Sequence, residues 1–437
     1  MKKLKQTILM LAAVLMLCGC AKKDELPMYI LTIWDAPEAD DGTSLDFSQS
    51  SEQVQLERSG FVRAVNDVSG TIAIYEYLVS EQNEPIEYMS DIATIFRSTD
   101  TLMTVGANTA VGTQYAEGES EFFNVPILNP FIDGDLFSSE TAGNAMNLSP
   151  SSEAYANFFS DHLYPDGFNR NLESYLFADS VVPDYSVKVA IFFPDDFNGH
   201  NTAVLIGQAL MANGADLEVY SAYAENYLDE TVANEWKNNQ SRMNDMDIVI
   251  IIGSHSQTKN DLSYVMESWQ GRQTPPAVIV CGVDVFDTIE VVSQYDNLYF
   301  VHQVLDVSKC PADITTYDEA MGYAAGYVTA SALIEVRDNP PARNTNFFSF
   351  LTGNRDSAES HRQLIEAYRD SVSTALRNLG GTDIPCYGKL RFTQNGQIDF
   401  TMGLFRYTDP EHMELVDESE IFNRVVRHIR EKYNIND

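Results

Sequence analysis

The stretch from Lys188 to Tyr220 constrains the fold more than any other part of the chain. It begins with a short apolar run, Val189 to Phe193, which is typical of a buried strand. The turn-forming run Pro194–Gly199 ends that strand, and a helical pattern follows. Gly214 then stands where a left-handed helix cap favours a residue without Cβ. Because Leu217 to Tyr220 starts another strand, the stretch predicts a βαβ unit, in which a helix connects two parallel strands.

The same alternation of strands and helices runs along most of the chain. Upstream of residue 150 it predicts four strands with covering segments between them: strands Tyr29–Trp34, Thr71–Val79, Leu102–Val105 and Val125–Leu128, and covering segments Gln53–Val68, Glu87–Arg97 and Gln114–Phe123. Downstream it predicts the helix Glu153–His162, the unit above, the strands Ile248–Ile252, Ala277–Cys281 and Leu298–Gln303, and the helix Asp261–Gln270. Short connections between alternating elements indicate two doubly wound α/β lobes.

Four further segments complete the predicted organisation. Ala145 to Ser152 is expected to be a crossover between the lobes. Tyr317 to Arg337 predicts a long helix in which Gly322 and Gly326, with the alanines between them, permit close packing. Ser360 to Leu379 predicts another helix. The run Tyr387–Phe392, followed by Asn395-Gly396, predicts a hairpin.

The first 20 residues form a targeting segment. Three lysines precede an apolar run, Ile8 to Leu17, that is too short to span a membrane. The segment closes with Leu17-Cys18-Gly19-Cys20, which resembles a bacterial lipobox, in which Cys20 would be lipidated and become the mature N-terminus. An ordinary secretory signal is the alternative. Residues 21–27 are expected to be a polar linker.

Charge and cysteine content narrow the possible partners and the redox chemistry. With 64 Asp+Glu against 28 Lys+Arg, the formal net charge is -36, which argues against binding to nucleic-acid phosphates. Outside the targeting segment the cysteines are Cys281, Cys310 and Cys386, with no C-x-x-C spacing. An exported protein could form one disulfide among them, and the sequence leaves the pairing open. Three buried free thiols are the alternative.

Motifs for chemistry are absent from the sequence. It contains no H-E-x-x-H, no Walker loop, no G-x-G-x-x-G after a strand and no G-x-S-x-G. The adjacent carboxylates Asp195 and Asp196 point in different directions and lack a catalytic partner, and Cys281 closes an apolar strand as a core residue. We therefore expect no enzyme activity, no metal site and no cofactor.

Seven segments, taken in order, resemble a known family. They are GFVRAVND (60–67), VGANTAVGTQYA (105–116), FNVPILNPFIDGDL (123–136), VAIFFPDDFNG (189–199), IVIIIGSHS (248–256), VIVCGVD (278–284) and GKLRFTQNGQ (388–397). Together they resemble the type I periplasmic-binding fold, and within it the solute-binding proteins for branched-chain amino acids and amides that serve ABC importers. The resemblance implies two α/β lobes with a hinge of about three crossovers. It divides the chain into 28–150 plus 305–383 and 151–304 plus 384–437.

The resemblance also implies a ligand site between the lobes, at the carboxyl ends of the strands. A hydroxyl and backbone N–H groups at Asn108 and Thr109 would hold the ligand carboxylate at a helix N-terminus. Asp284 would pair with the ligand ammonium. Two departures bear on the ligand: the family's glycine-rich turn is missing after Ser69-Gly70, and Phe131-Ile132 is bulkier than the usual pair. The candidate ligand residues are Asn108, Thr109, Phe131, Asp133, Phe197, Asn198, His255 and Asp284.

Most of these residues have a simpler alternative role. Thr109 and Asp284 could each serve only as a helix N-cap. His255 could be a hydrogen-bonded loop residue, and Phe197 could pack between the lobes. The functional expectation remains an extracytoplasmic, lipid-anchored protein of the cell envelope. It would capture a small polar ligand, amino acid or amide-like, for an ABC permease in the membrane, and would bind no nucleic acid. A ligand-sensing receptor lipoprotein on the same fold is the alternative, and a surface enzyme would require turnover of the bound solute.

Overall fold

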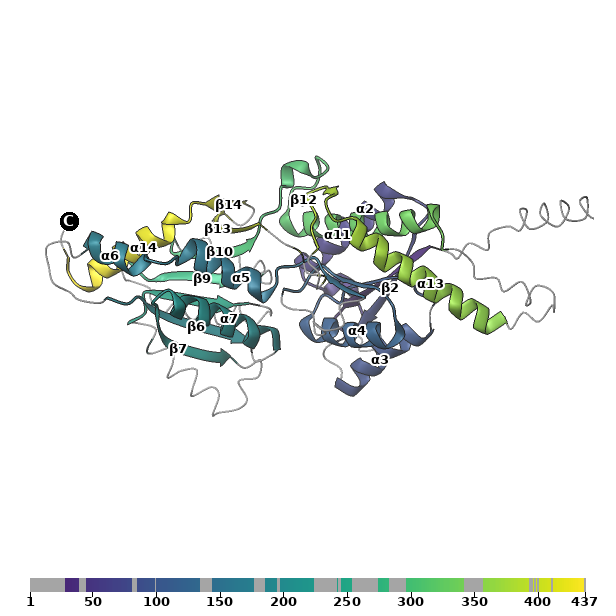
Figure 1. Ribbon diagram of the computed structural model, residues 1–437, viewed down its shortest axis with the longest axis horizontal. Helices are drawn as coiled ribbons and strands as arrows, with labels where there is room; N and C mark the ends of the chain where they lie inside the picture. Colours follow the sequence, from purple (N-terminus) through teal and green to yellow (C-terminus); the bar gives the residue numbers. More distant parts are fainter. Residues whose placement is uncertain are drawn as a thin grey trace, which may run out of the picture.

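The computed structural model describes residues 28–38, 45–80, 85–98, 100–133, 144–176, 185–194, 197–223, 242, 245–253, 274–282, 296–341, 357–392, 396, 398, 401–409 and 412–435. The predicted targeting segment with Cys20, and the predicted linker after it, lie outside these residues. The described elements form two α/β lobes placed end to end along the long axis of the molecule (Figure 1). The two lobes are those that the alternating pattern predicted; among the described residues one holds a five-stranded sheet and the other a seven-stranded sheet.

The first lobe is built on a parallel sheet with the order β2-β1-β3-β4-β5. The four predicted strands are present, and Ala145–Asn147 forms a fifth strand that pairs with β4. The prediction that the segment from Ala145 is only a crossover is therefore wrong at its start, because three residues are too few to show a periodic pattern. The strands are β1 (Tyr29–Asp35), β2 (Ala73–Val79), β3 (Thr104–Val105), β4 (Ile127–Asn129) and β5 (Ala145–Asn147).

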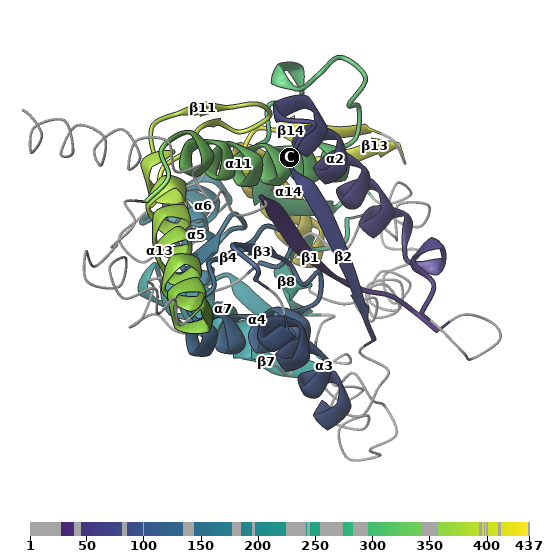
Figure 2. The ribbon, with the colours of Figure 1, turned by 90° about the vertical axis from the view of Figure 1, so that its right-hand side faces the viewer.

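Helices cover both faces of this sheet (Figure 2). Ile30 and Trp34 of β1 pack on one side with α2 (Glu52–Val68), α11 (Tyr317–Asp338) and α13 (Ser357–Asn378). Leu31 and Ile33 pack on the other side with α3 (Pro85–Ser98) and α4 (Ala110–Phe123). Because both faces are buried, β1 carries apolar residues on each of them and does not alternate between apolar and polar positions.

Glycines bring α2 and α11 into backbone contact. A Cβ atom on Gly322 would stand 1.9 Å from the Glu57 carbonyl oxygen, and one on Gly60 would stand 2.0 Å from the Glu319 carbonyl oxygen. Gly326 is similarly close to Phe61, at 2.4 Å from its carbonyl oxygen. The close packing predicted from the small residues of the long helix is confirmed.

The second lobe has the strand order β14-β13-β10-β9-β8-β6-β7. The predicted βαβ unit is confirmed, because β6 and β7 pair in parallel and α7 connects them. The pair β13 and β14 and the helix α14 add an antiparallel edge and a cover that the sequence analysis did not predict. The helix predicted over Asp261–Gln270 lies outside the described residues. The strands are β6 (Lys188–Pro194), β7 (Asp216–Tyr223), β8 (Ile248–Ile252), β9 (Ala277–Cys281), β10 (Leu298–Gln303), β13 (Met402–Asp409) and β14 (His412–Val416); the helices are α5 (Ser152–Phe158), η2 (Phe159–Leu163), α6 (Phe168–Leu176), α7 (Phe197–Ala212) and α14 (Ser419–Lys432).

The described chain passes between the two lobes three times: after β5, after β10 and before β13. Ile384, Leu390 and Ile398 pack into the core of the first lobe, although the predicted division assigns them to the second. Ile384 belongs to β11 (Asp383–Ile384), which pairs with β12 (Gly388–Lys389); Leu390 follows β12, and Ile398 forms an antiparallel bridge with Phe392. We propose that the first lobe comprises 28–150 and 305–398, and that the last crossover follows it.

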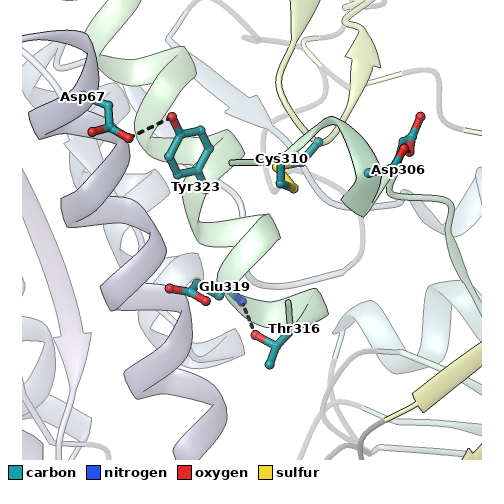
Figure 3. Close-up of a disulfide and its surroundings, with 8 residues drawn as sticks. Asp67, Asp306, Cys310, Thr316, Glu319 and Tyr323 are labelled. Atoms are coloured by element: carbon teal, nitrogen blue, oxygen red, sulfur yellow. Dashed lines mark hydrogen bonds between the residues drawn. A yellow bond between two sulfur atoms is a disulfide. The ribbon is translucent and has the colours of Figure 1, made fainter. Parts of the chain in front are cut away.

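The structure pairs Cys310 with Cys386 in a disulfide and leaves Cys281 as a buried free thiol. The bond lies beside the N-terminal half of α11 (Figure 3). Nearby, the Asp306 N–H donates to the Cys386 carbonyl oxygen at 2.7 Å. The disulfide therefore joins the segment after the second crossover, which contains η5 (Val307–Lys309), to the segment that precedes the third. Among the described residues, no helix has both the length and the apolar character to span a bilayer.

Candidate functional site

The loop after β3 carries the first two candidate ligand residues. Gly106 begins it with φ of +96°, and a Cβ atom there would stand 2.5 Å from the Ile33 carbonyl oxygen, so the turn requires glycine. The side-chain oxygen of Asn108 accepts a hydrogen bond from the backbone N–H of Asp35 at 2.6 Å. Asn108 thereby connects the carboxyl ends of β1 and β3. The Nδ2 atom of the same side-chain amide is a hydrogen-bond donor.

Thr109 is the N-cap of α4. Its hydroxyl oxygen accepts a hydrogen bond from the Gly112 N–H at 3.2 Å, and the Tyr88 hydroxyl lies 3.4 Å away. The capping role weighed from the sequence is thus present. A threonine hydroxyl also carries a proton, so Thr109 can cap the helix and donate to an anion placed at the same helix N-terminus.

Phe131 and Asp133 follow β4 and have protein partners. The ring of Phe131 is only 2% exposed and packs against Trp34, with 5.2 Å between ring centroids. Asp133 accepts a short hydrogen bond from the hydroxyl of Tyr155, which belongs to α5 of the second lobe. These two residues therefore support the core and the contact between lobes in this structure.

The second lobe contributes Phe197 and Asn198 at the start of α7. The Phe197 side chain is 52% exposed. The Asn198 side-chain oxygen is buried and has no hydrogen-bond partner in the described part of the chain. His255, Asp284 and the Asp195-Asp196 pair lie outside the described residues. Within the described ranges no three His, Cys, Asp or Glu side chains gather where they could hold a metal ion.

Two partly buried tyrosines bond residues that stand beside the crossovers. The Tyr387 hydroxyl lies 2.5 Å from the Leu148 carbonyl oxygen and 3.0 Å from the side-chain oxygen of Gln303. The Tyr317 hydroxyl lies 2.5 Å from Nδ1 of His302 and 3.0 Å from the Gln303 carbonyl oxygen. We call Tyr317 and Tyr387 the junction tyrosines. Sequence reasoning missed them, because their partners lie on other elements, up to 239 positions away, and no local pattern marks such a contact.

Burial shifts the pKa of three side chains at this junction: Tyr317, Tyr387 and His302. It raises the pKa of both junction tyrosines well above the ordinary value, and the charge of Asp133 contributes to each increase. Burial also lowers the pKa of His302 from 6.5 to about 3. The phenols are therefore protonated and the imidazole is neutral at neutral pH.

This buried histidine predicts a loss of stability in mild acid. As the pH falls below 6.5, the unfolded chain binds a proton that His302 in the folded chain does not bind until the pH reaches about 3. The stabilisation is therefore complete above pH 6.5 and is lost progressively below it. Between pH 6.5 and 4.5 we expect the free energy of unfolding of the wild type to fall by about 2 to 3 kcal/mol more than that of His302→Asn. Urea unfolding at both pH values measures the difference, and equal slopes for the two proteins would contradict it.

Comparison with known proteins identifies the fold. No family model matches the chain, and no curated protein matches it. Solved structures do: a leucine-binding protein from Thermotoga maritima has a TM-score of 0.59 at 12% identity, covering 89% of this chain and 97% of that one. A possible leucine/isoleucine/valine-binding protein from Rhodopirellula baltica has a TM-score of 0.60 at 11% identity, covering 92% and 100%. A solute-binding protein of an ABC transporter from R. palustris, in complex with benzoate, has a TM-score of 0.57 at 9% identity, covering 89% and 96%. The chain has the type I periplasmic-binding fold, as the resemblance predicted.

Proposed function

We propose that this protein is an extracytoplasmic solute-binding lipoprotein that captures a small polar ligand between its lobes for an ABC importer. The observation that carries the proposal is the fold itself, with two α/β lobes joined by three crossovers and candidate ligand residues placed at the carboxyl ends of strands in each lobe. In open α/β sheets, ligands bind outside those ends. The protein would then release the ligand unchanged.

The proposed ligand carries a carboxylate or a similar acceptor group. Asn108 and Thr109 at the N-terminus of α4 supply donors suited to it. Related structures contain leucine or benzoate, both of which carry a carboxylate. Phe197 and Asn198 would contact the ligand from the second lobe, together with His255. Asp284 would pair with an ammonium group, which favours an amino acid or amide-like ligand.

Lipidation of Cys20 would tether the protein to a membrane on the outer side, beside the permease. A ligand-sensing receptor with the same anchor is the second candidate function. The motif Leu17-Cys18-Gly19-Cys20 favours transport and sensing equally, since both functions would use the lipid anchor. Permease genes beside this one would favour transport, and their absence would favour sensing.

A ligand screen tests the proposal. Thermal unfolding of the soluble chain would be followed with amino acids, amides, nucleosides and sugars. A ligand present at 100 times its Kd should stabilise the protein by about 2.7 kcal/mol. Stabilisation by no member of these classes, or turnover of the bound compound, would contradict the proposal.

Once a ligand is found, Phe197→Ala tests the site. The expected result is an increase in Kd of about tenfold or more, because an aromatic ring that contacts a bound ligand is removed. Phe122→Ala is the matched control. Phe122 is 77% exposed and lies at the C-terminal end of α4, the end away from Thr109. An unchanged Kd in Phe197→Ala, or an equal increase in Phe122→Ala, would reject the assignment.

A further inference from the structure

We propose that the hydrogen bond from Tyr155 to Asp133 is a latch that sets the equilibrium between two relative positions of the lobes. Asp133 follows β4 in the first lobe, and Tyr155 belongs to α5, whose side chains pack in the core of the second. Tyr155 is only 2% exposed. The inference rests on the proposed function in one respect, that the lobes move relative to each other.

The latch lies where the crossovers meet. The charge of Asp133 raises the pKa of Tyr155, and it also raises the pKa of Tyr317, Tyr387 and Cys281, although burial is the larger cause in each case. Those groups come from α5, from the start of α11, from the turn between β11 and β12 and from the end of β9. One carboxylate thus stands close to segments from both lobes.

The latch differs from the other contacts of the junction. Tyr387 bonds Leu148 and Gln303, which stand where the chain leaves β5 and β10 to enter a crossover. Tyr155 and Asp133 instead belong to a helix and a loop that are anchored in opposite lobes. A rotation of the lobes must therefore lengthen or realign this bond. Hydrogen bonds to a carboxylate are stronger than neutral ones, and a low local dielectric strengthens them further.

It follows that the latch stabilises the lobe arrangement seen in Figure 1 relative to a rotated one. A contact shifts such an equilibrium only by its difference in free energy between the two states. Asp133 is then a positioning residue, which acts on ligand affinity through the lobes and makes no contact with the ligand.

Distances between spin labels test the latch without any ligand. One label at Gly118→Cys in α4 and one at Gln208→Cys in α7 would report the separation of the lobes, because both positions are exposed on helices of different lobes. In Tyr155→Phe we expect the population of a second distance to rise about tenfold or more relative to the wild type, which corresponds to about 1.4 kcal/mol.

Tyr185→Phe is the matched control. The Tyr185 hydroxyl donates to a buried carboxylate, Asp247, at 2.8 Å, but both residues lie within the second lobe. It should lower stability without changing the ratio of the two distances. Asp133→Asn retains an oxygen that accepts from Tyr155 and should change the ratio less than Asp133→Ala does.

A ratio in Tyr155→Phe within about twofold of the wild type, or an equal change in Tyr185→Phe, would overturn the proposal. If Tyr155→Phe does not fold, the comparison of Asp133→Ala with Asp133→Asn decides in its place, and equal ratios in these two variants would overturn it. Because no ligand is added, a negative result leaves the proposed solute-binding function to its own test.

Discussion

Replacing Gly322 with alanine is expected to lower the free energy of unfolding by about 3 kcal/mol, because the added methyl group has no space. Its carbon would stand 1.9 Å from the carbonyl oxygen of Glu57 and 2.7 Å from the carbonyl carbon. Both atoms belong to the backbone of α2, which cannot rotate away as a side chain can. The two helices must separate, and the contacts of Gly60 and Gly326 at the same interface would be lost with them. Urea unfolding followed by circular dichroism measures the effect.

Gly118→Ala is the matched control for this substitution. Gly118 also lies inside a helix, α4, but nothing stands within 4 Å of the position of its missing Cβ atom. There the higher helix propensity of alanine should act alone and raise the free energy of unfolding by about 0.5 to 1 kcal/mol. The two glycine-to-alanine changes should thus have opposite signs. Equal effects would show that helix propensity, and not the close approach of α2 and α11, governs Gly322.

Reduction of the disulfide is expected to lower the free energy of unfolding by about 4 kcal/mol. Cys310 and Cys386 are 76 residues apart, so the bond restricts a large loop of the unfolded chain. In the folded chain it holds the segment before α11 against the last segment of the first lobe, where Cys386 is fully buried (Figure 3). Denaturant unfolding with and without a phosphine reductant measures the difference.

Two variants control for other effects of the reductant. In Cys310→Ser/Cys386→Ser the reductant should have no effect, since no disulfide remains. In Cys281→Ala its effect should be the same as in the wild type, because the thiol of Cys281 is free. If the reductant changes the stability of the double variant, or fails to change that of the wild type, the disulfide is not what stabilises the loop.

Local patterns predicted the elements with strong periodicity. The apolar runs Val189–Phe193, Ile248–Ile252 and Ala277–Cys281 became central strands because a buried parallel strand is apolar on both faces. Short or mixed segments gave no such signal. Strand β5 has only three residues, which are too few for a periodic pattern. Strands β13 and β14 carry polar residues along an antiparallel edge, so their sequences lack the apolar run of a buried strand.

The candidate site divides in a similar way. Residues at strand ends could be predicted, since Asn108 and Thr109 follow an apolar run and precede a helix. In the structure the Asn108 side-chain oxygen accepts from the Asp35 N–H and the Thr109 hydroxyl caps α4, while their contact with a ligand stays a prediction. The partners of Phe131 and Asp133 could not be predicted, because Trp34 and Tyr155 reach them only through the packing of distant segments.

The order of the residues alone predicted a targeting segment, a strongly acidic composition and an alternation of strands and helices that requires covered parallel sheets. These properties depend on residues that are close in sequence, because the periodicity of a helix or strand and the residues of a turn are local patterns. Only the tertiary structure decided that Cys310 pairs with Cys386, that Ile384, Leu390 and Ile398 pack into the core of the first lobe, and that a tyrosine of one lobe bonds a carboxylate of the other. Each of these contacts joins residues far apart in sequence, and its formation depends on how the three crossovers bring the lobes together.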